Sequence, residues 1–205
     1  SQNHRHEEEG LLDSLIGHIR WESDALARRA RDLGPAAAAA HAYREEGPDC
    51  VLRMRGPFSI AIFDGASHKG LLAIDRMGIQ GLCYSRVAGA TVFATSAGVV
   101  AAHPAVGRRL NPQAIYNYLY CENVPAPGTI YEGISKLLPG QRLVVDGSGA
   151  REEFYWRLDY RPSGEPEAAL RAEFRRLLRE SVSRAATRET IGAFLSGGTD
   201  SSTVA

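Results

Sequence analysis

Two apolar runs that meet at an Asp-Gly pair constrain the fold of this chain more than any other feature. Residues 57–74 read PFSIAIFDGASHKGLLAI, and Asp64-Gly65 separates the two runs. An Asp-Gly pair between such runs is a strong hairpin signal, because both residues tolerate the positive φ angles of a tight turn. Apolar residues occupy both faces of the expected strands, so the sheet is predicted to be covered on both sides.

A second segment has the same character. Residues 81–96, GLCYSRVAGATVFATS, carry Ala88-Gly89 at the expected turn, and we interpret 57–96 as one antiparallel meander. Another hairpin is expected around the Gly147–Gly149 turn, between RLVVD and REEFYW. This run of hairpins, with helical segments on either side, predicts an α+β sandwich of antiparallel sheets with helices outside.

Helical patterns flank the expected strands. Residues 10–33 have apolar residues at helix-like spacing, and 34–47 have high helix propensity with a glycine at each end. Asn111 and Pro112 are typical of a helix start, as N-cap and first helical residue. The apolar residues of 170–182 follow one face of a long helix.

Charge and cysteine content exclude several classes of protein. The chain has 24 basic and 24 acidic residues, so no overall field attracts nucleic acid or an anionic membrane. Cys50, Cys83 and Cys121 are widely spaced, which favours reduced structural thiols in a cytoplasmic protein. No apolar run approaches the roughly 18 residues of a membrane span, and no signal-peptide pattern opens the chain. The polar residues 1–9 are not expected to form a core strand.

Residues 193–205, AFLSGGTDSSTVA, carry the chemistry that is easiest to interpret. We expect a short buried strand over 191–195, then a glycine turn rich in hydroxyls, then the first turn of a helix. Glycines let the backbone approach an anion closely, and free N–H groups at a helix start favour negative charge. The serine hydroxyls can donate to phosphate oxygens, and Asp200 can hold a divalent cation. A Walker A lysine is absent, and an ordinary helix cap is the alternative interpretation.

The SGGxDS pattern after an apolar strand resembles the ATP pyrophosphatase loop, which releases pyrophosphate and leaves an acyl-adenylate. Upstream, ATSAGVVAAHPAV, LNPQAIYNYLY, NVPAPGTIYEGISKLLPGQ and EFYW follow one another in the order typical of asparagine synthetases. The chain therefore closely resembles the asparagine synthetase (glutamine-hydrolysing) family. The resemblance is close over 43–205 and weak over 15–42.

The resemblance implies two domains. Residues 1–160 would form a class II glutamine amidotransferase-like domain, an N-terminal-nucleophile-type αββα sandwich that is degenerate or incomplete at its N-terminus. Residues 161–205, which begin within the linker YRPSGEP (160–166), would hold a linker helix and the truncated beginning of an α/β adenine-nucleotide alpha-hydrolase-like domain. The chain would then be a fragment, or a truncated reading frame, of a longer synthetase.

The implied activity is ATP-dependent amide ligation. ATP and magnesium would be the cofactors of the complete enzyme, and a small carboxylate with ammonia, an amine or glutamine would be the substrates. No nucleic-acid or membrane partner is expected, and a homodimer is among the expected assemblies. The residues assigned to ATP or pyrophosphate are Leu195, Ser196, Gly197, Gly198, Asp200, Ser201 and Ser202, with Asp200 as the metal ligand.

The resemblance also implies a degenerate glutaminase site, and no catalytic residue is assigned. Residue 1 is serine where the family has its cysteine nucleophile. Ile16, Gly17 and His18 replace an Asn-Gly-Glu triplet whose Asn side chain and Gly N–H form the oxyanion hole, and isoleucine has no side-chain donor. Pro35 stands where the family has a glutamine-binding Asp. Either an upstream segment with the cysteine is missing from this chain, or the domain has decayed to a structural role, as in β-lactam synthetase-like members.

Of the positions in the 74–84 segment, one has lost the residue usual in the family and three keep it. Ile74 replaces the arginine that usually precedes Asp75, whereas Asp75, Gly78 and Tyr84 keep the family pattern. The sequence therefore predicts a synthetase-type ligase, seen in part, in which glutamine hydrolysis is lost. Two alternatives remain: a non-catalytic module for folding, dimerisation or partner binding, and a free-standing glutaminase.

Overall fold

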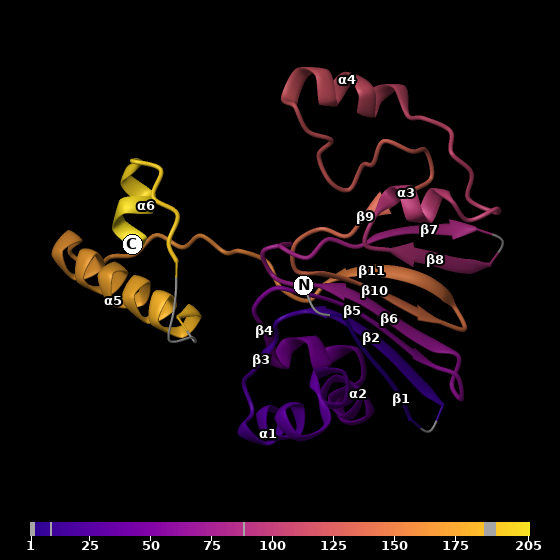
Figure 1. Ribbon diagram of the computed structural model, residues 1–205, viewed down its shortest axis with the longest axis horizontal. Helices are drawn as coiled ribbons and strands as arrows, with labels where there is room; N and C mark the ends of the chain where they lie inside the picture. The colour runs from indigo at the N-terminus through magenta and orange to yellow at the C-terminus, as the bar shows by residue number, and fades with distance from the viewer. Residues whose placement is uncertain (1–2, 9, 88, 187–191) are drawn as a thin grey trace. The chain divides into compact units, whose positions relative to one another are not determined.

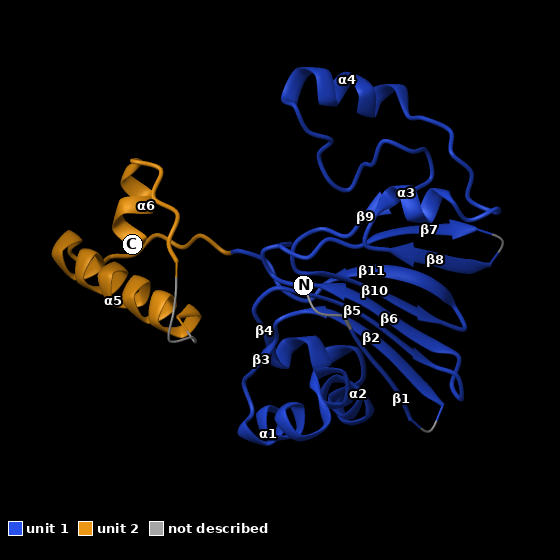
Figure 2. Ribbon diagram, in the orientation of Figure 1, with its two compact units in different colours: residues 1–158 blue, residues 159–205 orange. Residues whose placement is uncertain are grey.

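The computed structural model describes residues 3–8, 10–87, 89–186 and 192–205. The chain divides into two compact units, Ser1–Leu158 and Asp159–Ala205 (Figure 2). All strands of the described residues belong to unit 1, and the described part of unit 2 contains helices α5 and α6. No helix in these ranges combines the length and apolarity that crossing a membrane requires.

A six-stranded antiparallel sheet is the centre of unit 1 (Figure 1). Each strand pairs with its neighbours in antiparallel register. In spatial order the strands are β1 (Asn3–Glu8), β2 (Leu11–Gly17), β5 (Phe58–Asp64), β6 (Lys69–Ile74), β10 (Gln141–Asp146) and β11 (Gly149–Phe154). The hairpins predicted at Asp64-Gly65 and Gly147–Gly149 are confirmed by the β5–β6 and β10–β11 pairs.

A smaller sheet lies over one face of the first. Its strands, in spatial order, are β8 (Ala90–Ala94), β7 (Cys83–Val87) and β9 (Ser135–Lys136), and a separate pair joins β3 (Arg20–Trp21) to β4 (Met54–Arg55). The meander predicted over 57–96 is wrong, because β6 pairs with β10 rather than β7. A tight turn after Ile74, built around Asp75, takes the chain out of the first sheet and into the second.

Helices complete an αββα arrangement in unit 1 (Figure 1). Helices α1 (Asp24–Leu33) and α2 (Pro35–Glu46), with the 3₁₀ helix η1 (Gly47–Arg53), cover the outer face of the six-stranded sheet, and α3 (Ala97–Ala101) packs on β7 and β8. Helix α4 (Pro112–Cys121) begins at Asn111, whose Oδ1 accepts a hydrogen bond from the N–H of Gln113 at 3.0 Å. The predicted αββα sandwich, the helix over 34–47 and the Asn111 N-cap are confirmed.

The core has two layers, one on each face of the large sheet. Leu15, Phe58 and Ile60 pack with the alanines of α2, whose five residues 36–40 are all buried. On the other face, a cluster between the two sheets contains Ala61, Leu72, Ile74, Leu82, Tyr84, Leu137 and Leu143. Alanine lets α2 lie close to the strands, and the predicted two-sided cover of the sheet is confirmed.

The helix predicted over 10–33 is wrong in its first half. Leu11–Gly17 forms β2, in which buried and half-buried side chains alternate, and only Asp24–Leu33 is helical. The spacing of the leucines at 11, 12 and 15 suits a helix face and also a strand, so local periodicity did not distinguish them. The polar N-terminal residues form the edge strand β1, with no fully buried side chain among 4–8, as expected for residues outside the core.

Unit 2 contains α5 (Glu167–Ala185), which confirms the long helix, and the short α6 (Thr199–Val204). The strand predicted over 191–195 begins outside the described residues, since Ile191 is not among them. The rest of that prediction is wrong, because residues 192–195 are irregular and exposed. A strand needs a neighbour to satisfy its N–H and C=O groups, and the described part of unit 2 offers none.

Candidate functional site

The end of β2 holds Ile16 and Gly17, and His18 follows it; these are three of the positions that the sequence analysis assigns to a glutaminase site. Ile16 pairs with Ser59 and Gly17 with Phe58 across the β2–β5 ladder. The N–H of His18 donates to the carbonyl oxygen of Pro57 at 2.9 Å. The structure thus fixes this backbone segment against the start of β5.

Two glycines make this close approach possible. Gly17 has φ +121°, and a Cβ there would lie 2.2 Å from the carbonyl oxygen of Pro57. Gly56 has φ +92°, and a Cβ there would lie 2.6 Å from the carbonyl oxygen of His18. Any larger residue would meet backbone atoms, so glycine is required at both positions.

Of the four degenerate positions, only Ile16 lines a cavity between the sheets. This cavity has a volume of about 240 Å³ and is lined by Ser14, Ile16, Ser59, Ile60, Ala61, Leu82, Phe93, Ala94 and Thr95. No ionisable side chain is among these described residues. His18 is exposed, and Pro35 is the first residue of α2. The structure therefore brings Ile16 to the cavity but places neither His18 nor Pro35 on its wall.

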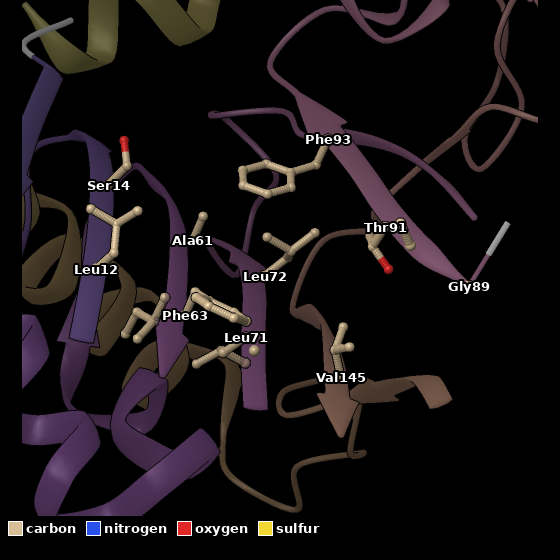
Figure 3. A pocket seen from close by; sticks show the side chains of 13 residues that line it. Leu12, Ser14, Ala61, Phe63, Leu71, Leu72, Gly89, Thr91, Phe93 and Val145 are labelled. Carbon is tan, nitrogen blue, oxygen red and sulfur yellow. The ribbon is translucent and has the colours of Figure 1, made fainter. Parts of the chain in front are cut away.

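A larger cavity of about 340 Å³ lies beside it, between the six-stranded sheet and β8 (Figure 3). Phe93 projects from β8 toward the large sheet, where Leu12, Ala61, Phe63, Leu72 and Val145 form most of the opposite wall. Ser14 and Thr91 supply the side-chain hydroxyls of the lining. Both cavities offer apolar surface and few polar groups, which does not suit the charged ammonium and carboxylate of a free amino acid.

Asp75 organises the turn that leads out of β6. It is 2% exposed, and its carboxylate accepts hydrogen bonds from the N–H groups of Phe58, Met77, Ile79 and Gln80 at 2.9–3.3 Å. Its own N–H donates to the carbonyl oxygen of Phe58 at 2.9 Å. Asp75, which keeps the family pattern, therefore joins β5 to this turn, and this structural role does not depend on any activity of unit 1.

Tyr84 links the two sheets. Its hydroxyl donates to Oε1 of Glu152 on β11 at 2.5 Å, and Arg86 donates to the same oxygen at 2.8 Å. Burial, followed by the hydrogen bond to Glu152, raises the pKa of Tyr84 to about 12. The phenol is therefore a neutral donor at physiological pH, and its geometry indicates a structural bridge.

Asp13 is a buried carboxylate that the sequence interpretation missed. It is fully buried, and neither carboxylate oxygen has a hydrogen-bond partner within the described ranges. It stands opposite His6 in the β1–β2 ladder and on the same strand face as Leu11 and Leu15. Burial raises its pKa to about 7, although the charge of Arg44 acts in the opposite direction. If residues 11–17 had been interpreted as a strand, in which alternate residues share a face, Asp13 would have been placed on the buried face with Leu11 and Leu15.

The loop of unit 2 that carries the predicted ATP ligands is held together by its own hydroxyls. The Oγ atoms of Ser196 and Ser201 are 2.9 Å apart, and the Ser201 hydroxyl also donates to the carbonyl oxygen of Gly198 at 3.1 Å. Gly197 has φ +78°, which L-residues rarely adopt. Asp200 is exposed in the first turn of α6. The structure thus brings the serines and glycines of the motif together in one turn.

These groups fit the chemistry of a magnesium–triphosphate ligand. Amide N–H groups and hydroxyls suit phosphate oxygens, and a carboxylate suits a hard divalent cation. Within the described ranges, no group of three or more His, Cys, Asp or Glu side chains could hold a metal ion. Asp200 contributes a single carboxylate to this turn. Leu195 precedes the turn as an exposed residue.

Two protein families match this chain, one over most of unit 1 and the other over the segment that carries the Ser196–Ser202 turn. Residues 18–156 match the glutamine amidotransferase domain family, which covers most of unit 1. The chain belongs to this family. A second match, to the asparagine synthase family, covers residues 173–205 and includes the whole Ser196–Ser202 turn. The pair of matches supports membership of the asparagine synthetase family, as the sequence motifs predict.

Two curated asparagine synthetases are similar to this chain in sequence. A putative glutamine-hydrolysing asparagine synthetase 2 of Methanocaldococcus jannaschii is 32% identical over 79% of this chain and 32% of its own length. Asparagine synthetase 3 of Bacillus subtilis is 26% identical over 80% of this chain and 27% of its own length. A glutamine phosphoribosylpyrophosphate amidotransferase structure from B. subtilis aligns at a TM-score of 0.42, with 13% identity over 78% of this chain and 32% of its own. The chain spans between about a quarter and a third of the length of the curated relatives it matches.

Proposed function

We propose that this chain is part of an asparagine synthetase-type amide ligase, which uses ATP to adenylate a small carboxylate and transfers ammonia or an amine to it. The observation that carries the proposal is the position of the Ser196–Ser202 turn inside the asparagine synthase match. The turn is supported as a phosphate site by glycines, which let backbone approach an anion closely, and by hydroxyls and a carboxylate, which suit phosphate and magnesium.

The roles of the loop residues follow from their chemistry. The N–H groups and hydroxyls of Ser196, Gly197, Gly198, Ser201 and Ser202 would hold the phosphates, and Leu195 would contact the nucleotide through its backbone. Asp200 would hold magnesium. ATP and magnesium, when bound, supply the activated phosphoanhydride and the positive charge that stabilises pyrophosphate as it leaves. The hydroxyls now bonded to each other are the donors that a phosphate would recruit.

We further propose that unit 1 does not hydrolyse glutamine. Ile16 has no side-chain donor for an oxyanion, and Pro35 has no carboxylate for the ammonium group of an amino acid. The cavity that Ile16 lines is apolar, with no ionisable side chain among its described residues. The nitrogen would then come from ammonia or an amine, and unit 1 would serve as a folded support.

We propose a cytoplasmic location, which is supported by the cysteines. Cys50, Cys83 and Cys121 are all free, and burial raises the pKa of the Cys50 thiol to about 12. A high thiol pKa disfavours the thiolate that forms disulfides and binds metals. Free thiols, two of them buried, suit a reducing compartment.

The ligase proposal is tested by exchange of labelled pyrophosphate into ATP, measured on a longer protein that contains this chain and a complete asparagine synthase domain. Magnesium and a panel of small carboxylic acids, beginning with aspartate, are supplied. Asp200→Ala should abolish exchange, because the metal–triphosphate complex loses a fixed ligand. Ser201→Ala should weaken exchange by less, since one hydrogen bond to a charged group contributes about 1.5–3 kcal/mol.

Ser163→Ala, in the irregular part of unit 2 that precedes α5, is the matched control and should leave exchange unchanged. Exchange that survives Asp200→Ala at the rate of the unchanged protein would show that the turn is only a helix cap.

A further inference from the structure

The larger of the two cavities described above, between the six-stranded sheet and β8, is built from strand positions that share one face of the large sheet. It has a volume of about 340 Å³, and we call it the inter-sheet cavity. Two cross-strand rows of side chains line it. The ladder pairings give these rows as Leu12, Phe63, Gly70 and Val145, and beside them Ser14, Ala61 and Leu72. The wall is therefore formed by three or more strands in fixed register, and its shape is defined by the fold.

Small residues in these rows leave the space open. Facing sheets normally interdigitate their side chains and fill the layer between them. Here Ser14 and Ala61 have short side chains, and Gly70 has none. Gly70 is not among the glycines with positive φ, and a Cβ there would be in ordinary contact with Val145 at 3.5 Å, so the backbone does not require glycine. The cavity therefore results from the residue types at these positions.

Two phenylalanines line the inter-sheet cavity from different sheets. Phe63 belongs to β5 and Phe93 to β8 (Figure 3), and their side chains remain 50% and 44% exposed. Aromatic rings pair favourably with a further ring in offset-stacked or edge-to-face geometry. Concave sites lined by apolar and aromatic side chains, with few polar groups, are typical of small-molecule binding. The two phenylalanines therefore favour a ligand that contains an aromatic ring.

The polarity of the lining selects a neutral ligand. No ionisable side chain is among the described residues that line the inter-sheet cavity. Moving an ion from water into such surroundings costs several kcal/mol, because no opposite charge compensates for the lost hydration. The hydroxyls of Ser14 and Thr91 can still exchange a hydrogen bond with one polar group of a ligand. The lining thus suits a neutral molecule with a single hydrogen-bonding substituent.

We propose that the inter-sheet cavity binds a neutral bicyclic aromatic molecule that carries one hydrogen-bonding substituent. Size supports two fused rings, because an apolar cavity of about 150 Å³ already binds benzene and this cavity is larger. The rings contact Phe63 and Phe93, and the substituent bonds to the Thr91 hydroxyl. The ligand lies beside the smaller cavity that Ile16 lines, since Ser14, Ala61 and Phe93 belong to both linings.

The test is calorimetric titration of the purified chain with 2-naphthol and with 2-naphthoate, which has the same rings and a negative charge. We expect 2-naphthol to bind at one site with a Kd below about 1 mM, as a ligand of this size can reach in an apolar pocket. The affinity for 2-naphthoate should be at least tenfold lower. Ala61→Leu should weaken 2-naphthol binding at least tenfold, because the larger side chain occupies the cavity. Ala25→Leu, the same change at an exposed position of α1, is the matched control and should leave binding unchanged.

Circular dichroism and thermal melting verify that each variant is folded, and Thr91→Trp fills the cavity from β8 as a second variant. Absence of 2-naphthol binding up to its solubility limit contradicts the proposal. Equal affinity for 2-naphthoate contradicts it as well, and so does binding that Ala61→Leu and Thr91→Trp both leave unchanged. Tighter binding of 1-octanol than of 2-naphthol would show that the cavity prefers a flexible chain to fused rings. These titrations contain no ATP, so their outcome is independent of the ligase proposal.

Discussion

Gly17 lies against Pro57 so closely that a Cβ on Gly17 would stand 2.2 Å from the Pro57 carbonyl oxygen. The N–H of the next residue, His18, donates to that same oxygen. The backbone at Gly17 and His18 is therefore fixed against the start of β5. The close approach gives Gly17 a structural role in the pairing of β2 with β5.

Gly17→Ala should destabilise unit 1 by roughly 2–4 kcal/mol, because a methyl group would overlap backbone and alanine disfavours φ +121°. Gly107→Ala is the matched control: Gly107 has φ +83°, but nothing lies within 4 Å of a Cβ there. The control should cost only about 1–2 kcal/mol, from backbone strain alone. Urea unfolding of the two variants measures the difference. Equal losses would show that the contact with Pro57 relaxes freely.

Asp13 should make the free energy of unfolding fall as the pH rises. Its pKa is about 7 in the folded chain and near 3.8 when unfolded, so the folded state holds a proton that the unfolded state releases between these values. The stabilising contribution is fully present below about pH 4 and is lost by about pH 7; about three pH units at roughly 1.4 kcal/mol each amount to about 4 kcal/mol.

Asp13→Asn removes this titration and keeps the size of the side chain. Relative to the unchanged chain, the variant should gain stability as the pH rises from 4 to 7, measured by urea unfolding at several pH values. The charged and titratable groups near Asp13 are His6 and Glu8 on β1 and Arg44 on α2. Parallel stability curves for the two proteins would mean that Asp13 is ionised or solvated in the fold.

Asp75→Ala should destabilise unit 1 by about 3–5 kcal/mol, because four N–H groups lose a common charged acceptor in a buried turn. Asp64→Ala provides the comparison. Asp64 accepts from the N–H groups of Ala66 and Ser67 in an exposed hairpin turn, where water can replace the carboxylate. Its loss should be much smaller in the same thermal or urea experiment. Similar losses would indicate that water also reaches the Asp75 turn.

Much of the fold could be predicted because local chemistry determines it. Asp64-Gly65 selects a hairpin, and Asn111 caps a helix, whatever surrounds them. The pairing of strands could not be predicted in this way. Which strand borders β6 depends on residues about 70 positions later in the sequence, and no local pattern indicates that β10 takes that place.

The wrong predictions of a helix at β2 and of a strand at residues 192–195 have related causes. Leu11 and Leu15 are consistent with both a helix and a strand, and only pairing with β1 and β5 decides between them. Residues 193–195 are apolar, as in a buried strand, but they are irregular because the described part of unit 2 contains no strand with which they could pair. The candidate loop was predictable because its glycines and serines lie in one continuous stretch, whereas Asp13 went unnoticed because its importance depends on burial.

Ammonia release from glutamine by the purified 205-residue chain is the decisive measurement for the proposed loss of glutaminase activity. With Ile16 and Pro35 in place of polar ligands and an apolar cavity beside Ile16, we expect no ammonia above a heat-inactivated blank. A glutamine-hydrolysing asparagine synthetase, assayed in parallel, verifies the detection. Ammonia release that Ser1→Ala abolishes would contradict this expectation, because it would show that unit 1 retains a working nucleophile.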